Sequence, residues 1–280
     1  MRGLTWGDVG RQLLRNPLSL AGTATIIALL LLALLAPYIA PFNPYATNPI
    51  QKLLPPSGTH LMGTDGLGRD VFSRVLYGTR ISLWIALLIL LIAGTLGTAV
   101  GIVAGYVGGF WDNVLMRITD VFMAFPQLIL AMAVAAALGP NLTNVVIAIS
   151  FGAWTVFARL ARSRAIAVRE EDFVEAARAV GAGPLRILFV HILPMALSPV
   201  IVQGTLSMGG IILTAAGLGF LGFGAQPPSP EWGLMVSDGR NFMPHAWWVS
   251  TFPGLAIMLT VLGFNLIGDG IRDILDPRMR

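Results

Sequence analysis

The stretch ISLWIALLILLIAGTLGTAVGIVAGY, residues 81–106, carries no charged side chain. A helix that rises about 1.5 Å per residue needs roughly 20 apolar residues to cross a hydrocarbon core about 30 Å thick, so this stretch predicts a membrane-spanning helix. Gly94, Gly97, Gly101 and Gly105 stand three or four residues apart on one face of that helix. This spacing favours close packing against another helix over a role in lining a pore.

Comparable apolar runs recur along the whole chain. Hydrophobic residues make up 55% and charged residues 11% of the 280 positions, whereas charged residues approach about a quarter of a soluble globular protein. The first run is longer than the core of a secretory signal, about 7 to 15 residues, so we expect it to be retained. The sequence predicts an all-α, polytopic membrane protein with six transmembrane helices. The expected spans are residues 18–39, 81–106, 115–138, 142–157, 195–223 and 247–271.

The distribution of basic residues predicts the orientation. Most of the eighteen lysines and arginines lie on the inner side when both termini are placed in the cytoplasm, as the positive-inside bias requires. Prolines concentrated in residues 37–56 and 227–230 mark connections in water, because they would leave backbone groups unpaired in lipid. Trp247 and Trp248 are typical of a membrane interface, although their segment is also a candidate contact for a partner outside the membrane.

Three arginines fit this topology poorly. Arg69, Arg74 and Arg80 crowd the outer end of the second expected span. We interpret them as part of an amphipathic segment on the outer surface, with Asp65 and Asp70 as candidate partners.

The sequence also restricts how transport is energised. Lys52 is the only lysine, and it neither follows a glycine-rich turn nor precedes Ser or Thr, which excludes a phosphate-binding P-loop. Charged residues of the spans lie near their expected cytoplasmic ends, not at the midplane where a coupling ion binds. There is no cysteine and no closely spaced pair among His60, His191 and His245, so neither a metal site nor a catalytic site is expected. An ion-coupled secondary transporter or channel remains the alternative to a transporter driven by partner ATPases.

A polar stretch at residues 159–191 separates the fourth and fifth expected spans. Asp172 and Glu175 predict a capping box at the start of a short helix, where acidic charge also suits the helix dipole. Gly181 is suited to the left-handed conformation that closes a helix, and Pro184 to the first turn of a second one.

Ala176, Ala177 and Ala179 expose little side-chain bulk on this predicted helix. The surface of another protein can therefore approach its backbone closely. A solvated linker fits the composition equally well, because helix propensity is a weak guide.

Glu175-Ala176-Ala177, Gly181 and Leu193-Pro194 resemble, at matching spacing, the EAA loop of permease subunits of ABC importers. His191 stands where the general pattern has isoleucine, as in peptide and nickel permeases. Further segments resemble the second permease subunit of dipeptide and oligopeptide importers. They are Gly63-Thr64-Asp65, Gly68-Arg69-Asp70, Ser73-Arg74, Phe125-Pro126-Gln127-Leu128, residues 217–224, Gln226-Pro227-Pro228, Glu231-Trp232-Gly233, Asn265-Leu266, Gly268-Asp269 and Asp276-Pro277-Arg278.

This resemblance covers nearly the whole chain and implies a type I ABC importer permease fold. It implies a cytoplasmic N-terminus at 1–17, a first transmembrane helix at 18–40, a periplasmic or extracellular segment at 41–80, and a core permease domain at 81–280. The coupling loop at about 168–194 would contact the ATPase. The residues assigned to that contact are Asp172, Glu175, Ala176, Ala177, Arg178, Gly181 and Pro194.

The partners implied by the resemblance are a second homologous permease, two ATPase subunits that bind ATP and magnesium, and an extracytoplasmic solute-binding protein. The chain itself would be non-catalytic, hold no cofactor or nucleic acid, and lie in the bacterial inner membrane. Peptides are the expected cargo, and nickel complexes, glutathione and short saccharides stay open.

Overall fold

The computed structural model describes residues 16–275, and this part of the chain is built from helices, with Thr64 and Asp70 forming an isolated β-bridge. The helices are α2 (Pro17–Ile39), η1 (Pro49–Gln51), α3 (Val71–Val107), α4 (Gly109–Met123), α5 (Gln127–Leu138), α6 (Leu142–Arg169), α7 (Asp172–Ala179), α8 (Pro184–Arg186), η2 (Ile187–Ile192), α9 (Leu193–Phe220), α10 (Trp232–Gly239), η3 (Arg240–Phe242) and α11 (Trp248–Leu275).

Within residues 16–275, five helical segments are long and apolar enough to cross a membrane, and α4 with α5 makes a sixth when the bent pair counts as one span. Each of the six expected spans therefore has a counterpart, and the predicted all-α, six-span membrane fold is confirmed.

The third predicted span is not one continuous helix, because α4 and α5 meet at a bend of 88°. Pro126 precedes α5 and lacks an N–H, and it disfavours helical geometry at Phe125, so the helix breaks there. The helix that contains the second predicted span begins at Val71, ten residues before Ile81, because Asp70 accepts a hydrogen bond of 2.8 Å from the Ser73 N–H and caps the helix there.

The chain packs as two compact units, which are described separately. Unit 1 comprises the described residues up to 88 together with 134–146 and the residues from 205 onward, and unit 2 comprises 89–133 and 147–204. Helices α3, α5, α6 and α9 contribute residues to both units.

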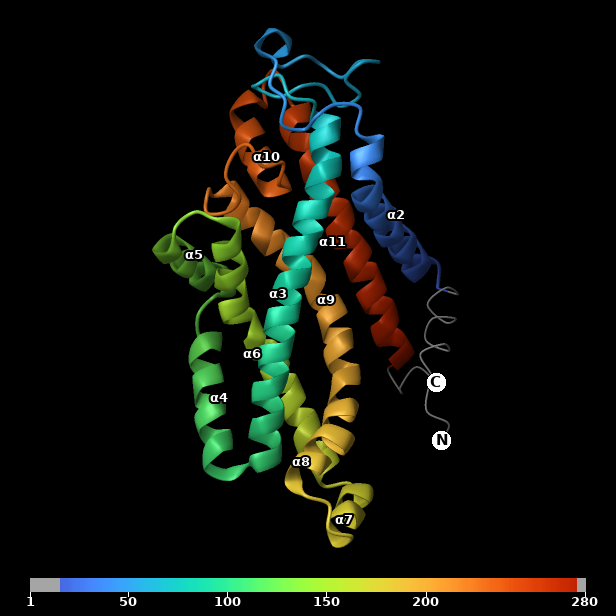
Figure 1. The fold of residues 1–280 in the computed structure, drawn as a ribbon, viewed down its shortest axis with the longest axis vertical. Helices are drawn as coiled ribbons and strands as arrows, with labels where there is room; N and C mark the ends of the chain where they lie inside the picture. The colour runs from blue at the N-terminus through green and yellow to red at the C-terminus, as the bar shows by residue number, and fades with distance from the viewer. Residues whose placement is uncertain (1–15, 276–280) are drawn as a thin grey trace. The chain divides into compact units, whose positions relative to one another are not determined.

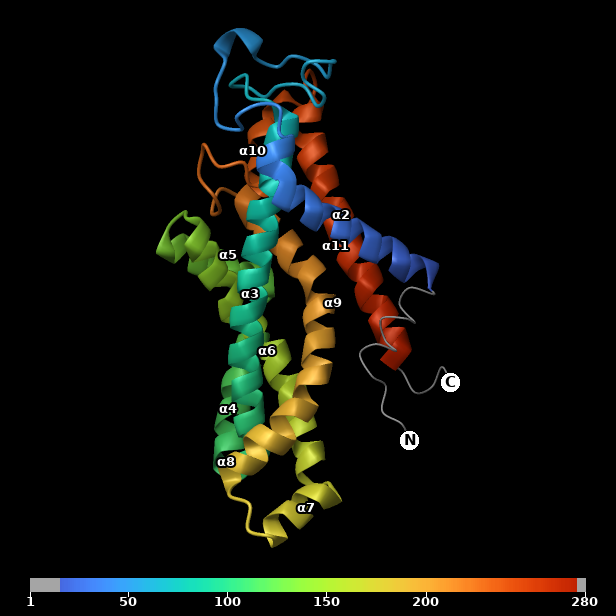
Figure 2. The same cartoon turned by 45° about the vertical axis from the view of Figure 1, so that its right-hand side comes forward.

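In unit 1, α2 lies against α11, as Figures 1 and 2 show. Glycines permit this close approach: a Cβ on Gly22 would lie 2.7 Å from the Leu266 Cβ, and one on Gly263 would lie 2.9 Å from the Ile26 Cδ1. Trp248 is not an exposed interface residue, since it is buried and its Nε1 donates to the Thr64 carbonyl at 3.1 Å. That part of the interface interpretation is wrong, whereas Trp247 is exposed.

In unit 2, the second part of α3 packs against α6. Cβ atoms added to Gly97, Gly101 and Gly105 would collide with backbone atoms of Trp154, Ala158 and Arg162 respectively. The predicted close packing is confirmed for these three glycines. Nothing lies within 4 Å of the corresponding position at Gly94, which takes no part in it.

Candidate functional site

The loop predicted from the polar stretch lies in unit 2, where α6 ends at Arg169 and α7 follows as a short separate helix (Figure 2). The predicted capping box is wrong. Helix α7 starts one residue earlier than a box requires, with Glu171 as its N-cap and no side-chain cap bond. Asp172 and Glu175 still lie in the first turn, where their negative charge complements the exposed N–H groups of the helix.

The C-terminal end of α7 closes as the sequence predicts. Gly181 has a φ of +85°, the left-handed conformation that glycine adopts without strain. The Gly181 N–H donates to the Arg178 carbonyl at 2.9 Å, and the Ala182 N–H donates to the Ala177 carbonyl at 3.0 Å. This pair of bonds is a Schellman motif. Pro184 then starts α8 at its first turn, which is also confirmed.

Val174 is the one buried side chain of helix α7. Val174 is fully buried and packs in an apolar cluster that contains Ile187 and Ile192 of η2. The residues assigned to the ATPase contact lie around the rest of the helix. Asp172, Glu175, Ala176, Arg178 and Gly181 are exposed, and Ala177 is half-buried.

Pro194 lies apart from α7, exposed in the first turn of α9. Pro194 lacks an N–H, and its ring crowds the carbonyl one turn earlier. This accounts for the wider π-helical winding of η2 just before Pro194, where the Leu193 N–H donates to the Leu188 carbonyl. His191 belongs to this segment, and its ring lies 5.9 Å from that of Phe173 on α7.

Sequence reasoning did not find the ion pairs that hold α4 to α6 in unit 2. Arg162 binds Asp112 through two bonds of 2.5 and 2.6 Å, and Arg159 binds Asp120 at 2.6 Å. The partners are separated by about 40 to 50 residues in sequence, so no local pattern could have paired them.

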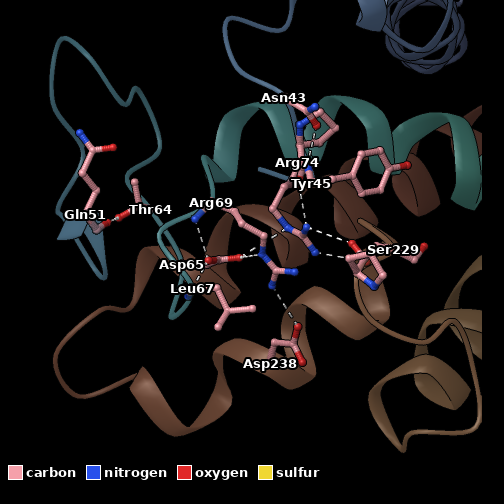
Figure 3. Close-up of polar contacts among 12 residues, drawn as sticks. Asn43, Tyr45, Gln51, Thr64, Asp65, Leu67, Arg69, Arg74, Ser229 and Asp238 are labelled. Carbon is pink, nitrogen blue, oxygen red and sulfur yellow. Dashed lines mark hydrogen bonds and ion pairs between the residues drawn. The ribbon is translucent and has the colours of Figure 1, made fainter. Parts of the chain in front are cut away.

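In unit 1, the segment between α2 and α3, residues 41–70, is here called the outer cap. Its two carboxylates, Asp65 and Asp70, and its one arginine, Arg69, are buried (Figure 3). Asp65 binds the Arg69 Nε at 2.6 Å and the Arg74 Nε at 3.6 Å, and Arg69 also lies 3.7 Å from Asp238 on α10.

A second buried pair lies in the same cap. Asp70 binds His60 at 2.9 Å, and the two side chains are almost fully covered. Asp65 is therefore a partner of Arg69 and Arg74, as predicted, whereas Asp70 pairs with His60 and not with one of the three arginines in the described part of the chain. The predicted amphipathic surface segment is wrong, since these groups are buried and Arg74 and Arg80 belong to α3.

Arg74 links three parts of unit 1. Its guanidinium donates to the carbonyls of Pro44 at 2.9 Å, Pro228 at 3.2 Å and Ser229 at 3.2 Å, while 1% of its side chain is exposed. Only a planar group with five donors can serve these acceptors together with Asp65.

The neighbouring α10 is capped by Glu231, which is buried and accepts from the N–H groups of Gly233 and Leu234, both at 2.8 Å. Burial raises the pKa of Glu231, and the two N–H donors oppose that effect. Burial also raises the pKa of Asp238, opposed by the nearby charges of Arg69 and Arg74.

The helical architecture of the described residues, with five or six candidate spans and a short exposed helix between two of them, is that of a multi-pass membrane protein. A family profile described as "binding-protein-dependent transport system inner membrane component" matches residues 97–280, and one described as "N-terminal TM domain of oligopeptide transport permease C" matches residues 5–56. The chain belongs to the family of binding-protein-dependent transport system inner membrane components.

Curated relatives agree with this family. The chain is 48% identical over 98% of its length to the dipeptide transport system permease protein DppC of Alkalihalophilus pseudofirmus, 90% of which is covered. It is 46% identical over 94% of its length to the probable D,D-dipeptide transport system permease protein DdpC of Escherichia coli, of which 88% is covered. It is 43% identical over 98% of its length to the glutathione transport system permease protein GsiD of Pectobacterium atrosepticum, of which 92% is covered.

A solved structure of the MetNI methionine ABC transporter in inward-facing conformations has the same fold. The TM-score is 0.56 at 20% identity, and the match covers 72% of this chain and 97% of that one. The fold is thus that of an ABC importer permease, in agreement with the resemblance found in the sequence.

Proposed function

We propose that this permease forms half of the translocation pore of an ATP-driven importer for dipeptides or related short peptides. A second homologous permease would form the other half, two ATPase subunits would supply the energy, and a solute-binding protein would deliver cargo from outside. The names of the relatives support peptides, and one of them names glutathione, which is itself a short peptide. The chain would lie in a bacterial inner membrane with both termini in the cytoplasm.

The exposed helix α7 is the observation on which this proposal rests. The apolar part of α6 ends near Phe157, and the helix continues to Arg169, about 18 Å further at 1.5 Å per residue. The headgroup layer is only about 5 to 8 Å thick on each side, so α7 is expected to lie in the aqueous phase beyond it. A helix there that exposes Ala176 and its charged neighbours is accessible to a cytoplasmic partner.

Energy would come from that partner and not from this chain. The sequence has a single lysine and no P-loop, which favours ATP and magnesium bound on separate subunits. When ATP draws the two ATPases together, α7 would move with them, and Val174 would carry the movement into unit 2. The coupling is limited by how differently the contact binds in the two states of the pore.

Two substitutions test the role of α7. Glu175→Lys reverses an exposed charge in the first turn, and Gly181→Val places a branched side chain at a φ of +85°. Both variants are expected to insert normally into the membrane and to lose peptide uptake, while the ATPases hydrolyse ATP without transport. Uptake and ATP hydrolysis are measured in proteoliposomes that contain the whole complex. Normal uptake by both variants at normal expression would contradict the proposal.

The alternative, an ion-coupled transporter or channel, is tested by co-purification. A permease of the proposed kind is expected to carry ATPase subunits through mild detergent extraction and to transport only with ATP inside the liposome. Transport by the isolated chain, driven by an ion gradient alone, would favour the alternative.

A further inference from the structure

The outer cap exposes an unusually small amount of charge. Among residues 41–70, all of which the structure describes, Lys52 is the one exposed charged side chain, because Asp65, Arg69 and Asp70 are buried. Soluble surfaces normally carry many charges, and charged residues are depleted where a protein surface becomes the core of an interface. This composition favours a surface that another molecule covers.

Two large aliphatic side chains are well exposed on this cap. Ile50 is 93% exposed and Leu67 is 47% exposed. The Asn48 N–H donates to the Leu67 carbonyl at 3.1 Å, and the Asn48 Oδ1 accepts from the Ile50 N–H at 3.2 Å. The backbone at Ile50 and Leu67 is therefore linked through Asn48, and Lys52 directly follows η1 in the same segment.

The cap is expected to lie beyond the lipid. Exposed Arg80 and Trp84, which is 60% exposed, are residue types that mark the membrane interface. Helix α3 rises about 14 Å from Arg80 to its first residue, Val71, at 1.5 Å per residue. This exceeds a headgroup layer of about 5 to 8 Å, so the occupant of the cap surface is expected to be a protein and not a membrane.

The cap is also held rigidly. Thr64 accepts from the Leu54 N–H at 2.8 Å and donates to the Gln51 carbonyl at 2.5 Å, and Asp65 orders the next turn by accepting from the N–H groups of Leu67 and Arg69 (Figure 3). A surface that is already ordered loses little conformational freedom when it binds, which favours affinity.

We propose that Ile50, Leu67 and Lys52 form a docking surface for the extracytoplasmic solute-binding protein. The inference rests on the proposed function and names the place where that partner contacts this chain. The match to a binding-protein-dependent family supplies the class of partner, and the single exposed cation calls for an acidic residue opposite Lys52. The apolar pair provides the centre of the contact and Lys52 its charged rim.

The experiment uses the whole complex in nanodiscs, with the purified binding protein of the same transport system loaded with dialanine as the probe. The measured quantity is the binding-protein concentration that gives half-maximal stimulation of ATP hydrolysis. Ile50→Asp and Leu67→Asp are each expected to raise it roughly tenfold or more, as for central interface residues. Lys52→Glu is expected to raise it about threefold, with a weaker salt dependence than the wild type. Thr59→Asp, which adds the same charge at another exposed position of the cap outside the proposed surface, is the matched control and should leave it unchanged.

Each further outcome has one meaning. Basal ATP hydrolysis without binding protein should stay at the wild-type level in all variants. An equal loss of basal activity in the Ile50 and Leu67 variants would overturn the inference, because it would assign the surface to lipid or to the second permease. Unchanged stimulation in these two variants would also overturn it. A wild-type complex that contains no ATPase subunits would instead refute the proposed function.

Discussion

The outer cap and helix α7 place their charges in opposite environments. In the cap, Asp65, Arg69 and Asp70 are buried, and each has a partner of opposite or titratable charge. On α7, the charged residues Asp172, Glu175 and Arg178 are exposed. Buried charges are strongly destabilising when one partner is removed, whereas exposed ones contribute little. The cap is therefore built to keep one conformation, and α7 is built to be contacted from outside.

The two regions also differ in how they are attached to their own units. Arg74 joins the cap to the loop before α10 through three carbonyls from two distant segments. Helix α7 depends on one buried side chain, Val174, and on the hydrogen bonds of its closing turn. Substitutions of the buried charged residues in the cap should consequently affect folding, whereas those on α7 should affect coupling.

The largest effect is expected for Arg74→Met. The substitution leaves the carbonyls of Pro44, Pro228 and Ser229 without their donor and removes a buried charge from beside Asp65, which costs about 3 to 5 kcal/mol. The free energy of unfolding can be followed through tryptophan fluorescence in detergent, because Trp232 and Trp248 are buried in the same unit.

Arg80→Met is the control for that prediction, because Arg80 is exposed on the same helix. It is expected to change the unfolding free energy by less than about 0.5 kcal/mol, as for most surface substitutions. Equal free energies of unfolding for the Arg74 and Arg80 variants would show that the buried arginine stabilises the protein no more than the exposed one.

The next largest effect is expected at Glu231. Glu231→Ala removes the acceptor of two buried N–H groups at the start of α10, at a cost of about 2 kcal/mol. Glu231→Gln keeps an acceptor but cannot ionise. Because the pKa of Glu231 is raised in the folded state, the wild type loses stability as the pH rises from the ordinary glutamate pKa through the raised one.

The pH dependence of unfolding therefore separates the two roles of Glu231. The glutamine variant should show a flatter pH profile above the ordinary glutamate pKa than the wild type, and the alanine variant should be less stable than the glutamine variant throughout. If the unfolding free energy of the glutamine variant had the same slope with pH as that of the wild type, ionisation of Glu231 would not cause the pH dependence.

The sequence predicts the spans well, because the lipid environment imposes length and hydropathy on every helix that crosses it. It also predicts the end of α7, since the left-handed position of Gly181 and the helix start at Pro184 are properties of single residue types. Features that depend on one residue and its immediate neighbours can be predicted from the sequence.

Features that depend on distant partners were not readable. Arg74 looks like a surface charge until Pro228 and Ser229, more than 150 positions away, are seen beside it. Val174 looks like an ordinary residue of an alanine-rich helix until Ile187 and Ile192 are seen to bury it. The capping box failed for a local reason, because a shift of one residue in the helix start removes it.

On α7 itself, Val174→Ala tests whether one side chain transmits movement. The loss of two buried methyl groups costs roughly 1.5 kcal/mol and loosens the helix on unit 2. The variant is expected to retain the ATPase subunits on purification but to transport several-fold less peptide per ATP hydrolysed. Val180→Ala is the control, because Val180 is 86% exposed, and it should keep the wild-type ratio of transport to hydrolysis. A wild-type ratio in the Val174 variant would show that the anchor is dispensable.

The last prediction concerns the hydrogen-exchange protection of the turn that closes α7. Substitutions of Gly181 and Gly183 are expected to change this protection in different directions. Gly181→Ala forces a Cβ into the left-handed region, where a φ of +85° costs about 1 to 2 kcal/mol, and should lower the hydrogen-exchange protection of the α7 amides. Gly183 has a φ of −68° and open space around it, so Gly183→Ala should leave that protection unchanged or raise it by up to about 1 kcal/mol by restricting the unfolded chain. Equal losses of protection in both variants would mean that the turn tolerates no side chain at all, and that its closure does not depend on the left-handed residue.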